Sequence, residues 1–187
     1  MPKLGMEPIR RAALVKATIA EVGDAGSLDV SVSRIAKRAG MSPALAHHYF
    51  GGKDQIFLAA MRQILRDYRA EVIAALAADP TDRARAIITA NFAPSCFDPA
   101  TVSAWMTFYV QAQTNPDALR LLAIYQSRLR SNLTHALRPL CDAPADAAAT
   151  LAAVIDGLYI RAALTAPDAD PEGRALSLLT TLTKGKA

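Results

Sequence analysis

Residues 31–53, SVSRIAKRAGMSPALAHHYFGGK, combine hydrogen-bonding side chains with compact residues at helical spacing. Pro43, Ala44 and Leu45 begin a segment in which two histidines follow one turn later. The major groove of DNA presents donors, acceptors and methyl groups to a helix that enters it. A helix with little bulk in its first turn and imidazole groups in the next suits that role. The pattern therefore predicts contact with the base edges of double-stranded DNA.

Two short helices must position these side chains, and the sequence carries end signals for both. Ser31 can cap the first helix, and Gly40 supplies the left-handed residue that ends it. Ser42 can cap the second helix, where Pro43 takes a first position whose N–H has no helical partner. Together these signals predict a helix-turn-helix over about 31–50. An ordinary pair of core helices is the alternative interpretation.

The expected DNA contacts divide into base contacts and phosphate contacts. We assign base edges to Ser33, Arg34, Leu45, His47 and His48, with Pro43 and Ala44 beside them. Either Leu45 or Ala44 is expected to pack against thymine methyl groups. We assign phosphates to Ser31, Ser42, Tyr49 and Lys53, helped by the helix N-termini. The histidines can also be read as solvent-facing polar residues. They do not form a metal site, because adjacent helical residues point about 100° apart.

The charge of the chain is concentrated at this end. Residues 1–53 contain eight Lys or Arg and four Asp or Glu, whereas the remainder contains 13 of each. The whole formal net charge of +4 therefore lies on the segment that carries the helix-turn-helix. Attraction to DNA phosphates requires such a basic surface, although a solvated helix face can be equally basic.

Composition narrows the cellular setting and the class of protein. Two cysteines, Cys96 and Cys141, are too few for a disulfide framework and predict free thiols in a reducing cytoplasm. The N-terminus lacks an apolar signal core. The apolar run 147–164 is interrupted by Asp156 and Arg161, so it does not predict a membrane span. We expect a cytoplasmic protein with no membrane partner, no cofactor and no metal.

Helical periodicity continues through the rest of the chain, so the expected fold class is all-α. Residue–proline pairs mark most of the helix boundaries. The expected helices outside the helix-turn-helix are 9–23, 53–78, 81–92, 100–114, 117–138, 144–165 and 171–184. The first three helices form a head, and one long helix joins it to a helical body. The expected domains are 8–68 and 69–187.

The strings IAKRAGMS and HHYFGGKD resemble the TetR family of bacterial repressors, whose helix-turn-helix ends in an aromatic residue, Phe, two linker residues and Lys. Further strings are MPKLGMEPIRR at the start, AWMTF at 104–108, SRLRSNL at 127–133 and IDGLYIRAAL at 155–164. With these the chain is similar to the choline-responsive regulators of glycine-betaine synthesis within that family. The resemblance implies repression of genes for choline uptake and oxidation, relieved by choline or a related quaternary amine. The recognition segment PALAHHY varies among relatives, so the operator sequence does not follow.

A single head reads too few base pairs to select a genomic site, so a homodimer on a palindromic operator is expected. The helix at 144–165 and the last helix carry apolar stripes that would form a four-helix bundle between subunits. The residues assigned to this interface are Leu151, Val154, Ile155, Leu158, Leu176 and Leu179. These stripes could instead only close the core of one subunit.

Effector binding is expected in the body, where aromatic residues gather. Trp105, Phe108 and Tyr109 share one helix face, and Tyr125 and Tyr159 lie farther along the chain. Aromatic faces and a carboxylate are the natural partners of a quaternary ammonium, and Asp156 is the candidate carboxylate. Aromatic residues at this spacing more often belong to a core, and Asp156 could instead pair with Arg161.

Three other functions compete with this interpretation. An enzyme is disfavoured because the chain has only three histidines, no HExxH, no phosphate-binding glycine loop and no paired cysteine motif. An architectural DNA-binding protein would need no effector, and the large aromatic-rich body argues against it. A TetR-type repressor that responds to a different hydrophobic or cationic compound is the strongest alternative.

Overall fold

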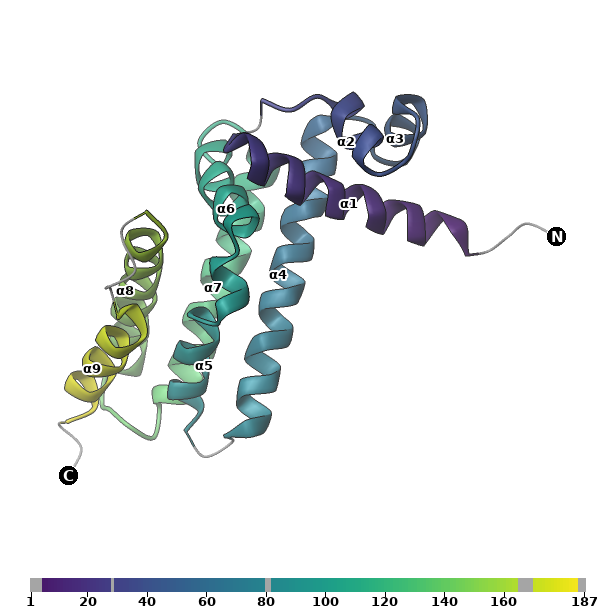
Figure 1. Cartoon of the computed structure of the whole chain (residues 1–187). Helices are drawn as coiled ribbons and strands as arrows, with labels where there is room; N and C mark the ends of the chain where they lie inside the picture. The colour runs from purple at the N-terminus through teal and green to yellow at the C-terminus, as the bar shows by residue number, and fades with distance from the viewer. Residues whose placement is uncertain (1–4, 28, 80–81, 165–169, 185–187) are drawn as a thin grey trace. The chain divides into compact units, whose positions relative to one another are not determined.

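The computed structural model describes residues 5–27, 29–79, 82–164 and 170–184. Within these ranges the chain forms nine α-helices, one 3₁₀ helix and no strands, so the expected all-α class is confirmed (Figure 1). The α-helices are α1 (Met6–Ala25), α2 (Val32–Arg38), α3 (Pro43–Phe50), α4 (Lys53–Ala78), α5 (Arg83–Asn91), α6 (Pro99–Gln111), α7 (Pro116–Leu137), α8 (Pro144–Leu164) and α9 (Pro171–Thr183). The 3₁₀ helix η1 (Pro94–Phe97) precedes α6.

The helices form two compact units. The first comprises Met1–Arg66 together with Asp98–Arg120, and the second comprises Asp67–Phe97 together with Leu121–Ala187. Helix α6 therefore belongs with the N-terminal helices, which a single boundary after residue 68 does not anticipate. The side chains that fill the core of the first unit include Leu14, Val22, Ile35, Ala46, Ile56, Phe57, Met61 and Phe108.

Local signals fix both ends of the helix-turn-helix as expected. The Ser31 hydroxyl oxygen accepts the backbone N–H of Arg34 at the start of α2. Gly40 has φ 68°, and its N–H bonds to the carbonyl of Lys37 while Met41 N–H bonds to that of Ala36. That pair of bonds is the Schellman arrangement, which favours glycine at the left-handed position.

Helix α3 begins with the two signals read from its sequence. The Ser42 hydroxyl oxygen accepts the backbone N–H of Leu45, and Pro43 occupies the first turn. Gly51, with φ 82°, ends the helix and starts the turn into α4. The predicted recognition segment is thus a capped helix held between two glycine turns.

Helices α1 and α6 approach each other closely at Gly23. A Cβ built on Gly23 would lie 2.5 Å from the Cβ and 2.6 Å from the Cα of Ala100. No side chain larger than hydrogen fits between two backbones at that separation. The end of α1 therefore rests directly on the first turn of α6.

The second unit packs α5, α8 and α9 with parts of α4 and α7. Its largest fully buried side chains include Ile87, Ile88, Leu133, Leu137, Leu151 and Ile155. Aspartate caps begin two of its helices, since Asp82 accepts the N–H of Arg85 and Asp170 that of Gly173. Helix α8 is long and apolar enough to cross a membrane by length and composition alone, a test that helices of water-soluble proteins also pass.

Candidate DNA interface and effector site

Helix α3 divides into one buried and one exposed face. Ala46 is fully buried, whereas Ala44, His47 and His48 are exposed and Leu45 is half-buried. The Nδ1 atom of His47 lies 3.1 Å from the Gly51 carbonyl oxygen. In the neutral tautomer that donates to this carbonyl, Nε2 remains as an acceptor on the exposed face. The residues assigned to base edges on α3 therefore share a surface that DNA could reach.

The serines assigned to phosphates are also the helix caps. The Ser31 oxygen lies 3.2 Å from the amide nitrogen of Arg34, and the Ser42 oxygen lies 3.3 Å from that of Leu45. A hydroxyl that accepts through its oxygen keeps its O–H as a donor. Capping is thus compatible with donation to a phosphate. Pro43 and Ser33 are exposed, and Lys53 is half-buried at the first position of α4.

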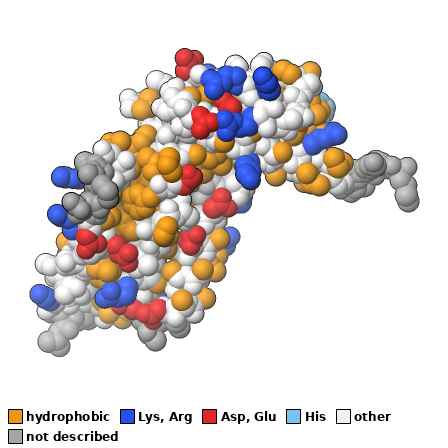
Figure 2. Space-filling model, in the orientation of Figure 1, with side chains coloured by type: hydrophobic (Ala, Val, Ile, Leu, Met, Phe, Trp, Pro, Cys, Tyr) orange, Lys and Arg blue, Asp and Glu red, His pale blue; other side chains and the backbone are white. Residues whose placement is uncertain are grey.

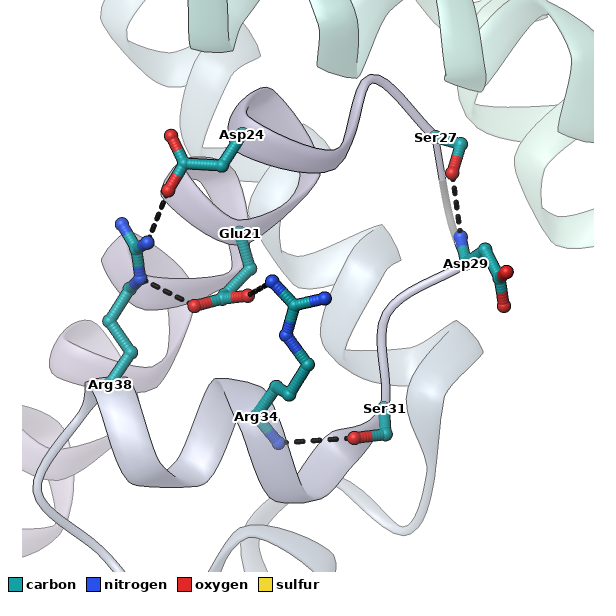
Figure 3. A network of polar contacts seen from close by, with 7 residues as sticks. All are labelled: Glu21, Asp24, Ser27, Asp29, Ser31, Arg34 and Arg38. Atoms are coloured by element: carbon teal, nitrogen blue, oxygen red, sulfur yellow. Dashed lines mark hydrogen bonds and ion pairs between the residues drawn. The ribbon is translucent and has the colours of Figure 1, made fainter.

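A buried carboxylate on α1 holds α2 in place (Figure 3). The Glu21 side chain is 8% exposed, and its oxygens lie 2.8 Å from Arg34 Nη2 and 2.6 Å from Arg38 Nε. Arg38 also pairs with Asp24. A buried charge is strongly destabilising without partners, so these contacts tie the two helices together. Arg34 is therefore engaged with Glu21 in the free protein, and its base-edge role stays a prediction.

A second set of contacts anchors the end of α3 to the start of α1. The guanidinium of Arg11 lies 5.6 Å from the ring centroid of Tyr49 and 5.0 Å from that of Phe50. Arg10 Nη1 lies 3.4 Å from the Tyr49 hydroxyl oxygen, to which it donates. Cation–aromatic contacts of this kind contribute about 0.5–1 kcal/mol each at exposed sites. Arg10 and Arg11 therefore position the recognition helix.

Sequence analysis missed these positioning residues, although one of them carries a readable signal. Glu21 lies seven residues after Leu14 on the apolar face of α1, together with Thr18 and Val22. An acid on a buried helix face requires a cation from another element. The basic residues of α2 were the nearest candidates. Arg10 and Arg11 carry no such signal, since their helix positions alone do not reveal which rings they meet. Figure 2 shows Lys and Arg side chains over the helices of this head on the face in view.

The six residues assigned to the effector fall into two groups, one in each unit. In the first unit, the Trp105 ring lies 5.7 Å from that of Phe108 and 5.9 Å from that of Tyr109. Phe108 is fully buried and Trp105 is 8% exposed, so both are core residues of the unit that carries the DNA-binding helices. The other three residues, Tyr125, Asp156 and Tyr159, belong to the second unit.

The group in the second unit joins a carboxylate to aromatic hydroxyls. The Tyr125 hydroxyl donates to Asp156 Oδ1 at 3.1 Å, and the ring of Tyr125 lies edge-on to that of Tyr68 at 5.9 Å. The Tyr159 hydroxyl donates to the Cys96 carbonyl at 2.8 Å, and its ring lies 5.2 Å from that of Phe97. Tyr68 and Phe97 thus extend the predicted set. Tyr68 continues the apolar face of α4 between Ile64 and Val72, where nothing in the helical spacing distinguished it from an ordinary core residue. Phe97 lies at the end of η1, and its neighbours in the sequence do not mark it as a site residue either.

Burial sets the electrostatics of this group. Desolvation raises the pKa of the Asp156 carboxyl above its usual value, and the hydrogen bond from Tyr125 partly opposes that rise. Desolvation also raises the pKa of the Tyr68 hydroxyl; a hydrogen bond with Asn91 opposes that rise, and the charges of Cys96 and Asp156 add smaller contributions to it. A carboxylate in such surroundings gains from a cation brought against it. Across the described segments, no three His, Cys, Asp or Glu side chains gather as metal ligands.

Family comparisons identify both parts of the chain. Residues 14–60 match the family described as bacterial regulatory proteins, tetR family. Residues 80–185 match the family described as BetI-type transcriptional repressor, C-terminal. The chain is 51% identical over 183 residues to the HTH-type transcriptional regulator BetI of Brucella anthropi, covering 96% of this chain and 94% of that protein. It is also 51% identical over 170 residues to the BetI regulator of Rhizobium meliloti, covering 88% and 83%.

Solved structures share the fold at lower identity. A TetR transcription regulator from Haloarcula marismortui has a TM-score of 0.81 at 19% identity, covering 95% of this chain and 97% of its own. A transcriptional regulator from Saccharomonospora viridis, solved in complex with choline, has a TM-score of 0.73 at 20% identity, covering 94% and 96%. Two family descriptions match the chain, and relatives about half identical to it cover most of its length. Both findings agree with the helix-turn-helix geometry. The chain therefore belongs to the TetR family, with a BetI-type C-terminal part, and it is a DNA-binding transcriptional repressor rather than an enzyme.

Proposed function

We propose that this repressor controls genes for choline uptake and glycine-betaine synthesis in the cytoplasm, and that choline or a related quaternary amine releases it from its operator. The BetI names of the half-identical relatives and the BetI-type C-terminal match support the pathway. The choline complex of the Saccharomonospora viridis regulator supports the ligand class. The observation that carries the proposal is the aromatic and carboxylate group of the second unit.

That group offers what a quaternary ammonium needs. The trimethylammonium head of choline donates no hydrogen bond, so its attraction comes from ring faces and from negative charge. Tyr125 and Tyr159 bring aromatic rings, and Tyr68 and Phe97 lie against them. Asp156 brings a desolvated carboxylate whose ionised form a bound cation would stabilise. Trp105, Phe108 and Tyr109 remain proposed effector contacts, although two of them are core residues.

We propose that the DNA-bound form is a homodimer on a palindrome, with recognition helices roughly 34–36 Å apart or somewhat more. Of the six residues assigned to the interface, Leu151, Ile155 and Leu179 are buried within one chain and so close its own core. The half-exposed residues Val154, Leu158 and Leu176 remain available to a partner. This division reflects an ambiguity of amphipathic helices, whose apolar stripe serves a core and an interface equally well.

Switching requires a ligand that prefers the conformation unable to bind DNA. We propose that effector binding shifts α4, which begins at Lys53 beside the recognition helix and contributes Tyr68 to the aromatic group. A small tilt of this helix would change the spacing of the two heads. A preference of about 100-fold for the released conformation corresponds to roughly 2.7 kcal/mol per site.

The effector test titrates the protein–operator complex with choline, glycine betaine and the uncharged isostere 3,3-dimethylbutanol. Choline is expected to release the DNA and the isostere is not. Asp156→Asn should weaken choline binding by about tenfold or more while operator affinity is kept. Because the pKa of Asp156 is raised, choline affinity should fall as the pH drops through that pKa and the carboxylate is lost.

Contrary results separate the pathway from the binding chemistry. Failure of choline to bind or release DNA at millimolar concentrations would reject the pathway and leave the repressor assignment intact. Equal release by 3,3-dimethylbutanol would reject the cation–aromatic account.

The fluorescence of Trp105, the single tryptophan, adds a local readout. Trp105→Ala should leave operator affinity intact and abolish release if that ring touches the ligand, although loss of a core ring costs about 3–5 kcal/mol of stability.

DNA contacts can be sorted by their dependence on sequence and salt. Lys53→Ala should weaken binding to operator and random DNA alike. It should also reduce by about one the slope of the logarithm of the binding constant against the logarithm of the salt concentration, because a phosphate contact releases a counterion.

His47→Ala should cost about 1–3 kcal/mol of binding free energy on the operator and little on random DNA, because a base contact carries sequence information. Both variants are measured against operator and scrambled duplexes across a salt series. Equal losses for His47→Ala on the two duplexes would assign this residue to the backbone.

A further inference from the structure

A hollow of about 630 Å³ lies in the second unit. None of the residues of the Tyr125–Asp156 group is among its described lining residues. It is bounded by the start of α5, the end of α7 and the last turns of α9. Hollows of 300–1,000 Å³ are the usual size of sites for small molecules. Nothing in the proposed choline response uses this hollow.

The lining of the hollow is strongly basic. Arg83, Arg85, His135 and Arg138 are among its lining residues, and all four are exposed. Among the described lining residues the single acid is Asp82, whose Oδ2 lies 3.1 Å from Arg85 Nε. For Arg83 and Arg138 no ion pair is found among the described residues. Two arginines without a carboxylate partner among the described residues therefore line one concave surface, where an anion would gain from their positive charge.

The hollow also has an apolar side. Leu179 is 7% exposed, and Leu140 is 37% exposed. Ala136 is buried beside them in the lining. An inorganic anion alone would leave this apolar surface in contact with water, whereas an anion with a short hydrocarbon part would cover it. The two kinds of lining together select an amphipathic anion over a bare one.

We propose that this hollow is a second small-molecule site, which binds a carboxylate or phosphate group through Arg83 and Arg138 and a short apolar segment against Leu140 and Leu179. Arginine suits this role because its planar donors match both kinds of oxyanion. The charge is opposite to that of a quaternary amine, and the site shares no residue with the Tyr125–Asp156 group. The affinity of this hollow for an anion can therefore be measured separately from the affinity of the Tyr125–Asp156 group for choline.

His135 is a built-in reporter, because the other two histidines, His47 and His48, both lie on α3. The full-length protein is titrated with butyrate, butyl phosphate, inorganic phosphate and butanol at constant ionic strength. The C2 proton of His135 is followed by NMR. Saturable shifts with butyrate or butyl phosphate, at least fivefold tighter than with inorganic phosphate, are expected at His135 and not at the histidines of α3. Whichever of the two compounds binds identifies the head group.

Matched variants make the assignment specific. Arg83→Gln and Arg138→Gln should each weaken binding fivefold or more, and Arg130→Gln should not, because Arg130 is exposed on α7 outside the lining. Thermal unfolding followed by circular dichroism shows whether each variant is folded. Shifts that fail to saturate, equal shifts with butanol, or losses in Arg130→Gln that match those in Arg138→Gln would overturn the proposal.

Discussion

Ala153→Arg is expected to leave the protein monomeric and to reduce operator affinity by a factor of about 10²–10⁴, the range that linkage of two binding events supplies. Ala149, Ala153 and Gly157 recur every fourth residue on α8 and are exposed in the single chain. A Cβ added at Gly157 meets nothing within 4 Å of the same chain. A second copy could approach this face closely, with the half-exposed Val154 and Leu158 beside it.

The choice of Ala153 keeps folding and assembly apart. Its exposure means that an arginine is solvated in the monomer and costs little stability there. In a dimer built on this face, the same arginine would be buried without a partner. Leu158→Arg should also prevent dimerisation, but Leu158 is half-buried, so this variant could lose its fold as well. Ala153→Arg is therefore the sharper test.

Leu119→Arg is the matched control, since Leu119 is 55% exposed on α7 and was assigned to no interface. Its mass and its operator affinity should equal those of the unchanged protein. Light scattering after size exclusion gives the mass, and fluorescence anisotropy with a labelled operator gives the affinity. A dimer of normal operator affinity from Ala153→Arg would remove this face of α8 from the interface.

The helix-turn-helix could be predicted in detail because its signals are local. Ser31, Gly40 and Ser42 act through the backbone of the next few residues, so the sequence alone identifies their roles. The long helix also matches the expected 53–78 at both ends. Helix α1 starts at Met6 rather than Ile9, because Pro8 is tolerated within a first turn. The 3₁₀ turn η1 was not expected.

Contacts between distant residues could not be predicted. The Tyr159 hydroxyl meets the carbonyl of Cys96, 63 residues away, and Arg11 meets the ring of Phe50. Helical spacing tells which side chains share a face, but the partner of that face depends on how the helices pack. For this reason the sequence places Trp105 and Leu151 on apolar helix faces. It does not reveal whether such a face packs into the core, contacts a ligand or contacts a partner subunit, and in the structure both residues are buried.

Gly23→Ala is expected to destabilise the first unit although alanine favours helices by up to about 1 kcal/mol over glycine. The added Cβ would lie 2.5 Å from the Cβ and 2.6 Å from the Cα of Ala100, so α1 and α6 must move apart. Overpacking of this kind typically costs about 1–3 kcal/mol of stability. Over most of that range, the cost exceeds what alanine gains in helix propensity. After subtraction of that gain, we expect the free energy of unfolding to fall by up to about 2 kcal/mol.

A double variant tests whether the backbones themselves are in contact. If only the Ala100 methyl group blocked the new side chain, Gly23→Ala with Ala100→Gly would recover the lost stability. Because the Cα of Ala100 is almost as close as its Cβ, we expect little recovery beyond the sum of the single changes. Gly5→Ala is the control, since a Cβ at Gly5 meets nothing within 4 Å. Urea unfolding of the four variants and the unchanged protein measures each free energy. A Gly23→Ala protein as stable as the unchanged one would show that α1 and α6 separate at no cost, and α6 could then shift without moving the DNA-binding helices.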